Sequence, residues 1–157
     1  MSDAPLKFPL PSEEDTTRFG RWLAWHLRAG DVVALEGPIG AGKTHFARAF
    51  IRARLKTEED VPSPTFTLIQ TYPADVDIWH ADLYRLSHPD EVLELGLEEA
   101  FSTSICLIEW PERMGTLLPA DAIHLRFVPL GESRKAVILA GTRPDLVQAL
   151  RRDWGAA

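Results

Sequence analysis

The sequence GPIGAGKT at residues 37–44 has the form G-x-x-x-x-G-K-T of a phosphate-binding loop. It follows the apolar run Val32–Leu35 and precedes Phe46–Phe50, so a strand, a loop and a helix are predicted in the order that this motif requires. The glycines let the backbone curl until its N–H groups point at phosphate oxygens, and the start of the helix adds the positive end of its dipole. We therefore predict a nucleoside triphosphate site, in which Lys43 reaches the β- and γ-phosphates and the Thr44 hydroxyl binds Mg²⁺.

The composition is that of an ordinary globular protein. Hydrophobic residues make up 45% of the 157 positions and charged residues 25%, so a single domain over residues 1–157 is expected. No apolar run approaches the ~20 residues of a membrane span, and residues 1–5 lack the features of a secretory signal. The single cysteine, Cys106, lies in an apolar run and cannot form a disulfide framework or a zinc site within this chain. No membrane association and a cytoplasmic location are expected.

The formal net charge is -6, and no cluster of five or more basic residues occurs. A protein that holds RNA or DNA by itself usually carries a basic stripe. Any role in nucleic-acid chemistry is therefore expected to be indirect, through a partner.

Secondary structure can be predicted from helix caps, hydrophobic periodicity and turn residues. Ser12, with Asp15 three residues later, is typical of a helix start, and the apolar spacing continues this helix to about Arg28. Predicted helices cover residues 12–28, 46–55, 87–101 with a break near Gly96, and 144–154; predicted strands cover 32–36, 65–72, 76–84, 105–108, 123–128 and 134–139. Hairpins beside a strand–loop–helix unit favour an α/β protein, with a three-layer P-loop NTPase fold and a mixed central sheet flanked by helices.

Two carboxylates are candidates for binding the metal ion or positioning the attacking water at the triphosphate. Glu109 follows the wholly apolar run Ile105–Ile108, and the C-terminal end of a buried parallel strand lies beside the phosphate loop, where a carboxylate reaches a metal. A solvated carboxylate at a strand end is the alternative. Asp82 is the second candidate, although a pairing with Arg85 at the sheet edge would explain it equally. His80 shares a strand face with Asp82, which also permits a transition-metal site.

Two further residues have both a functional and a structural interpretation. Thr65 follows a proline-bearing loop and could sense the γ-phosphate as switch-loop threonines do, or it could simply begin a strand. Trp110, directly after Glu109, could close over the nucleotide or meet a partner, or it could pack in the core.

Four ordered blocks resemble the TsaE (YjeE) family of small bacterial P-loop ATPases. They are GPIGAGKT at 37–44, SPTFTL at 63–68, HADLYRL at 80–86 and ICLIEWP at 105–111. The first block is common to many NTPases, whereas the others in this order are specific to the family. The resemblance runs from Pro9 to about Leu139.

The resemblance implies a role for each matching residue. Catalytic roles fall to Lys43, Thr65, Asp82 and Glu109; metal binding to Thr44, Asp82 and Glu109; and nucleotide binding to Glu13, Gly37, Gly40, Ala41, Gly42, Lys43, Thr44, His45, Trp110 and Gly131. Glu13 and Gly131 match places that flank the adenine, and Thr65 matches a switch-like loop. His45 departs from the family, which commonly has a small hydroxyl residue there; its imidazole N–H could replace that donor to the α-phosphate.

The resemblance also implies the biology. Family members support threonylcarbamoylation of the adenosine beside the anticodon of tRNA, together with the partner proteins TsaB and TsaD. The ATPase docks on that pair, and hydrolysis of ATP resets the complex. We therefore expect an ATP- and Mg²⁺-dependent ATPase that is weak alone, contacts TsaB and TsaD, and meets tRNA only through the complex.

Two other functions fit the same loop. A small-molecule kinase would use Asp82 as the base for a substrate hydroxyl, although no arginine-rich lid is present in the sequence. A nucleotide-gated binding module would bind ATP and hydrolyse it too slowly to matter.

Overall fold

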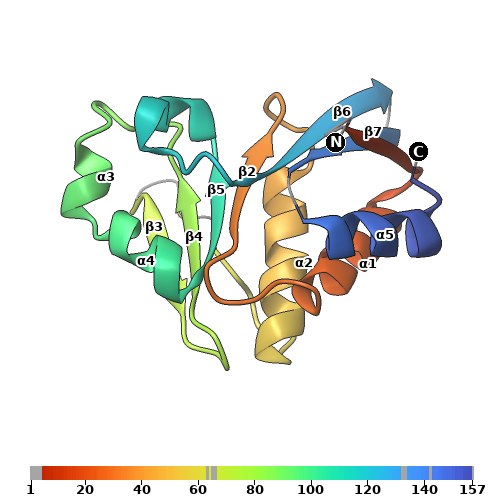
Figure 1. The fold of residues 1–157 in the computed structure, drawn as a ribbon, viewed down its shortest axis with the longest axis horizontal. Helices are drawn as coiled ribbons and strands as arrows, with labels where there is room; N and C mark the ends of the chain where they lie inside the picture. Colours follow the sequence, from red (N-terminus) through yellow and green to blue (C-terminus); the bar gives the residue numbers. More distant parts are fainter. Residues whose placement is uncertain (1–4, 63, 65–66, 132–133, 142, 157) are drawn as a thin grey trace.

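The computed structural model describes residues 5–62, 64, 67–131, 134–141 and 143–156. These residues form a seven-stranded sheet with helices packed against it (Figure 1). The elements in chain order are β1 (Leu6–Leu10), α1 (Glu13–Ala24), β2 (Val32–Glu36), α2 (Lys43–Leu55), β3 (Ile69–Tyr72), β4 (Ile78–Asp82), α3 (Glu91–Glu94), α4 (Leu97–Thr103), β5 (Ile105–Glu109), the 3-10 helix η1 (Pro111–Leu117), β6 (Ile123–Gly131), β7 (Arg134–Ala140) and α5 (Pro144–Trp154).

The sheet is mixed, as predicted, and β2 lies at its centre. The strand order is β1-β7-β6-β2-β5-β4-β3. Strand β2 pairs in parallel with β5 and with β6, and β4 pairs in parallel with β5. The remaining pairs, β1 with β7, β6 with β7 and β3 with β4, are antiparallel. The parallel centre is buried on both faces, which is why β2 and β5 are almost wholly apolar.

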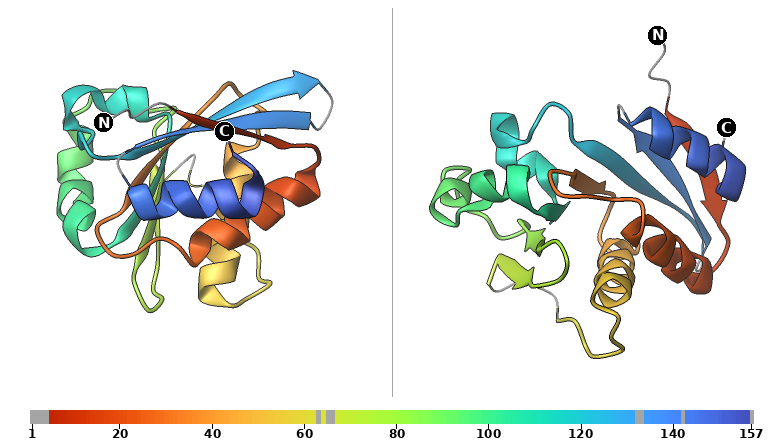
Figure 2. Two further views of the ribbon diagram at one scale, coloured as in Figure 1. Left: turned by 45° about the vertical axis from the view of Figure 1, so that its right-hand side comes forward. Right: turned by 60° about the horizontal axis from the view of Figure 1, so that its bottom comes forward.

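Two hydrophobic clusters on opposite faces of the sheet produce the predicted three layers. Successive side chains of a strand point to opposite faces. Val33 and Leu107 accordingly pack into the cluster that contains the buried residues of α1, α2 and α5. Cys106 and Ile108 pack into the other cluster, with α3, α4 and η1. Helices α1, α2 and α5 gather on one side of β6 and β7 in the left view of Figure 2.

Helix α1 begins where it was predicted but ends earlier. The Ser12 hydroxyl accepts a hydrogen bond from the backbone N–H of Asp15 at 3.2 Å, which confirms the N-cap. The helix ends at Ala24 rather than near Arg28, so the predicted end was wrong. The guanidinium of Arg54 on α2 donates to the carbonyl oxygens of Ala24 and Leu27, and these contacts hold the chain after Ala24 in a non-helical path.

The other elements differ from the predictions mainly at their ends. Gly96 does divide the predicted helix 87–101, because it takes a positive φ of 81° at the start of α4. Strand β3 begins at Ile69 rather than at Thr65, a residue that lies outside the described part of the chain. Neither the edge strand β1 nor the 3-10 helix η1 was predicted. No helix within the described residues is long and apolar enough to cross a membrane.

Candidate functional site

The phosphate loop connects the central strand β2 to helix α2 and leaves the start of that helix open. Gly42 occupies the N-cap position with a φ of 99° and makes no side-chain cap, so the first backbone N–H groups of α2 stay available to an anion. Gly37 has a φ of 140°, and a Cβ there would lie 2.7 Å from the carbonyl oxygen of Phe127. The loop therefore requires glycine at both ends for the conformation that it adopts.

Lys43 is folded back onto the loop. Its Nζ donates a hydrogen bond to the carbonyl oxygen of Gly37 at 2.6 Å and lies 3.6 Å from the centroid of a Trp110 ring. Burial lowers the pKa of Lys43, and the carboxylates of Glu109, Glu112 and Asp82 act in the opposite direction. The ammonium group is thus held by one carbonyl and an aromatic face, contacts that a phosphate can replace.

Glu109, the last residue of β5, joins the phosphate loop helix to the neighbouring strand. Its Oε1 accepts a hydrogen bond from the Thr44 hydroxyl at 2.8 Å, and its Oε2 lies 2.7 Å from Nε2 of His80 on β4. The Glu109 side chain is 3% exposed and that of His80 is fully buried, so this bond is shielded from water. The parallel register, which pairs Leu35 and Asp82 with Glu109, explains why these groups meet.

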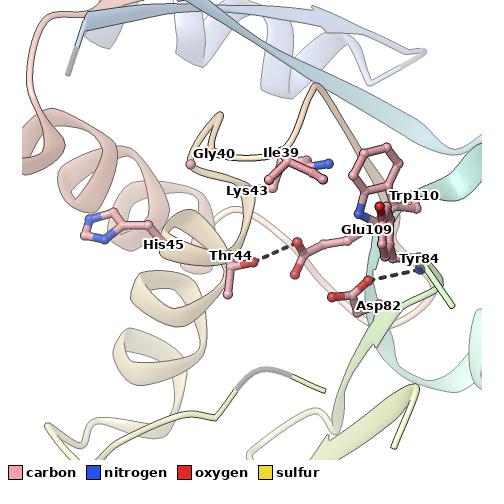
Figure 3. Close-up of a pocket in the computed structure, with 10 residues that line it drawn as sticks. Ile39, Gly40, Lys43, Thr44, His45, Asp82, Tyr84, Glu109 and Trp110 are labelled. Carbon is pink, nitrogen blue, oxygen red and sulfur yellow. Dashed lines mark hydrogen bonds between the residues drawn. The ribbon is translucent and has the colours of Figure 1, made fainter. Parts of the chain in front are cut away.

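Asp82 ends β4 beside Glu109 and points into the same hollow as Thr44 (Figure 3). Its Oδ1 accepts a hydrogen bond from the backbone N–H of Tyr84 at 3.1 Å, which orients the carboxylate. Asp82 is 6% exposed. The cavity measures about 390 Å³ and is lined by Ile39, Gly40, Gly42, Lys43, Thr44, His45, Asp82, Tyr84, Glu109 and Trp110.

The backbone turns sharply at Trp110, the residue that follows β5. Its backbone is left-handed, with φ 60° and ψ 51°, a conformation that non-glycine residues rarely adopt and that tends to occur at functional sites. The turn places the half-buried indole over Lys43 and within 5.0 Å, between ring centroids, of Tyr84. Trp110 therefore both packs against the second hydrophobic cluster and lines the cavity.

Some predicted residues are not brought to the centre of the cavity. The His45 ring points toward α1, where its Nε2 lies 2.8 Å from the Thr17 hydroxyl (Figure 3). Glu13 and Gly131, expected beside the adenine, begin α1 and end β6 and do not line the 390 Å³ cavity. Thr65 lies outside the described residues. Their roles stay predictions.

The sequence did not predict the contacts of two residues that shape the candidate site. His80 was considered only as a transition-metal ligand, and the structure pairs it with Glu109 instead. The signal was present, because a histidine between apolar residues of a buried strand needs a polar partner. Tyr84 was part of the HADLYRL block but had no assigned contact; it lines the cavity opposite the phosphate loop.

The fold and the loop at the end of its central strand define an α/β protein of the P-loop NTPase class. The crystal structure of Bacillus subtilis YdiB superimposes on it with a TM-score of 0.80 and 27% sequence identity, over 97% of both chains. The family model described as "Threonylcarbamoyl adenosine biosynthesis protein TsaE" matches residues 10–137. The chain therefore belongs to the TsaE family of threonylcarbamoyl adenosine biosynthesis proteins.

Curated relatives agree with this assignment. The protein named tRNA threonylcarbamoyladenosine biosynthesis protein TsaE from Rickettsia felis is 38% identical over 145 residues, which is 90% of this chain and 85% of the relative. The protein of the same name from Rickettsia bellii is 42% identical over 127 residues, or 80% and 88% of the two chains. The one from Bacillus subtilis is 34% identical over 134 residues, or 84% and 83%.

Proposed function

We propose that this protein is a Mg²⁺-dependent ATPase that serves tRNA threonylcarbamoyladenosine synthesis. The observation that carries the proposal is the hydrogen bond between Thr44 of the phosphate loop and Glu109 of β5, at 2.8 Å, beside the buried ammonium of Lys43. A hydroxyl from the loop and a carboxylate from a neighbouring parallel strand are the two protein groups that hold Mg²⁺ in P-loop NTPases. Family membership supplies the pathway.

The residues present suit Mg²⁺ better than a softer metal. The described residues contain no group of three or more His, Cys, Asp and Glu side chains arranged to hold a metal ion. Mg²⁺ does not need one, since it is commonly bound through one or two carboxylates with the remaining positions taken by water and substrate phosphates. Thr44 and Glu109 would hold the ion, with Asp82 beside them. The bound cation would neutralise charge that develops on the phosphate oxygens.

Protein groups around the cavity would bind the phosphates and position the attacking water. The open N-terminus of α2 receives the β-phosphate, and Lys43 exchanges its contact with Gly37 for the β- and γ-phosphates. Asp82, oriented by the backbone N–H of Tyr84, positions the attacking water or a metal-bound one. Thr65 is proposed to contact the γ-phosphate.

The pathway also suggests the partners. We propose that the protein acts on the TsaB–TsaD pair and that tRNA is met only through that complex. The net charge of -6 supports an indirect role, because a chain that is acidic overall repels the phosphate backbone. Turnover in isolation is expected to be slow, with partners completing the arrangement around the attacking water.

The test is phosphate release from Mg-ATP without any acceptor, measured with and without TsaB and TsaD. Lys43→Ala and Glu109→Gln should each reduce release by roughly tenfold or more. Glu98→Gln is a matched control, because this exposed glutamate on α4 does not line the cavity and is not among the carboxylates that act on Lys43. Absence of nucleotide binding by the unmodified protein would exclude the proposal, and phosphate transfer that needs an acceptor would indicate a kinase. Failure of TsaB and TsaD to bind or stimulate would exclude the partners alone.

A further inference from the structure

Lys135, on strand β7, lies against the phosphate loop. A Cβ added at Gly42 would overlap the Lys135 Nζ and would lie 3.4 Å from its Cε. The residue is paired with Leu10 of β1 and precedes Val137, a core residue of the face covered by α1 and α2, by two positions. Register therefore directs Lys135 to the side of the sheet where α2 begins. The sequence motifs gave no indication of this contact, since β7 is far from the loop in the chain.

Lys135 is largely withdrawn from solvent and makes no ion pair with the described residues. Lys135 is 8% exposed, and Nζ makes no hydrogen bond or ion pair with the residues that the structure describes. Burial lowers the pKa of Lys135, and the nearby Glu13 carboxylate opposes that shift without forming an ion pair with the lysine. A charge removed from water costs free energy unless an opposite charge compensates it. An anion bound at Gly42 would provide that compensation.

Lys135 and Lys43 approach the loop from opposite sides. Strands β5 and β7 lie on either side of β2, and Figure 1 shows the same arrangement. Lys43 is turned toward Trp110, which follows β5, whereas Lys135 comes from β7 and is close to Glu13 at the start of α1. Glu109 and Asp82, the carboxylates proposed to act at Mg²⁺ and the γ-phosphate, line the cavity on the Lys43 side. The opposite side of the phosphate loop, where Lys135 lies, is therefore expected to face the α-phosphate end of a bound nucleotide.

We propose that Lys135 is a second phosphate-binding cation, which contacts the α-phosphate of a bound nucleoside di- or triphosphate. The inference rests on the proposed nucleotide site and adds a residue to it. The His45 ring, whose Nε2 lies 2.8 Å from the Thr17 hydroxyl, points away from the expected position of the α-phosphate. Lys135 provides the positive group at that position instead. Because ADP and ATP share the α-phosphate, Lys135 stabilises both complexes to the same extent.

The decisive experiment measures the dissociation constants of ADP and ATP by calorimetry for the full chain and for Lys135→Met. We expect both constants to rise by a similar factor of roughly ten or more, since a charge-assisted contact to phosphate is lost. Lys135→Arg keeps the charge and should retain most of the affinity. Lys7→Met is the matched control, because Lys7 is an exposed lysine on β1 in the same part of the sheet.

Thermal unfolding of the nucleotide-free protein separates binding from a structural role. Removing a largely desolvated lysine that makes no ion pair with the described residues should leave the melting temperature unchanged or raise it, whereas a lysine that supports the fold would lower it on replacement. An unchanged dissociation constant for Lys135→Met, or a loss confined to ATP, would overturn the assignment to the α-phosphate. If the unmodified protein bound neither nucleotide, the proposed function itself would fail, and Lys135 with it.

Discussion

Replacement of His80 by phenylalanine tests whether this residue positions Glu109. The Nε2–Oε2 distance of 2.7 Å and the burial of both side chains describe a hydrogen bond to a carboxylate shielded from water. The other ring nitrogen, Nδ1, has no hydrogen-bond partner among the described residues, so the substitution removes one described hydrogen bond while a ring still fills the space. Glu109 would then be free to leave the position from which it meets Thr44.

The magnitude follows from the kind of bond. A hydrogen bond to a charged group contributes about 1.5 to 3 kcal/mol. If all of it serves to hold Glu109 in place, the rate of phosphate release falls roughly 10- to 150-fold, since each ~1.4 kcal/mol corresponds to a factor of ten. The Mg²⁺ concentration that gives half-maximal rate should rise, whereas binding of ADP without Mg²⁺ should change little.

The assay is phosphate release over a titration of Mg²⁺, with His80→Gln as the rescue variant. A glutamine amide can donate to Glu109 from nearly the same place as Nε2, so it should recover part of the rate. His88→Phe, an exposed histidine on a different segment, is the control. A His80→Phe protein that folds, as judged by circular dichroism, and keeps the normal rate and Mg²⁺ dependence would refute the reasoning.

Three further predictions concern the stability of the fold. Gly20→Ala should destabilise the protein by about 1 to 2 kcal/mol in urea unfolding. The added Cβ would lie 2.9 Å from Ala49 Cβ and from the Phe46 carbonyl oxygen, and the cost of this overpacking exceeds the gain in helix propensity. An unchanged urea midpoint would contradict this packing. Arg143 holds the pKa of Asp145 well below its ordinary value through a hydrogen bond. Asp145 therefore adds stability above its unfolded pKa of about 4 that is lost as the pH falls through the lower folded value, so Asp145→Asn should lower the urea midpoint at pH 7 but much less at pH 2. Burial raises the pKa of the Cys106 thiol to about 12, so alkylation by iodoacetamide at pH 8 should be slow in the native protein and fast in urea; rapid labelling without denaturant would contradict the buried placement.

The elements that depend on local chemistry could be predicted from the sequence. Ser12 starts α1, Gly96 divides a helix, and an apolar run becomes the buried strand β5, because each depends on residues that are close in the chain. The end of α1 could not be predicted in this way. It depends on Arg54, which reaches across from another helix to the carbonyl oxygens of Ala24 and Leu27.

The same distinction applies to the site. Lys43, Thr44 and Glu109 could be predicted to lie together because a loop motif and a strand end have fixed positions in this class of fold. The contacts of His80 with Glu109 and of Lys135 with Gly42 arise from strand pairing and register between distant segments. A single sequence does not fix the register, so it did not indicate that His80 meets Glu109 or that Lys135 meets Gly42.

The two margins of the sheet limit how this protein can assemble with others. One edge strand, β1, contains Pro9, which has no backbone N–H to donate to a neighbouring strand. The other edge strand, β3, is four residues long. Edge strands that are short or contain proline pair poorly with a strand of another molecule, so extension of the sheet between copies is disfavoured. Complexes are therefore expected to form through side chains on helices and loops, which can be remodelled by point mutation without disturbing the strands.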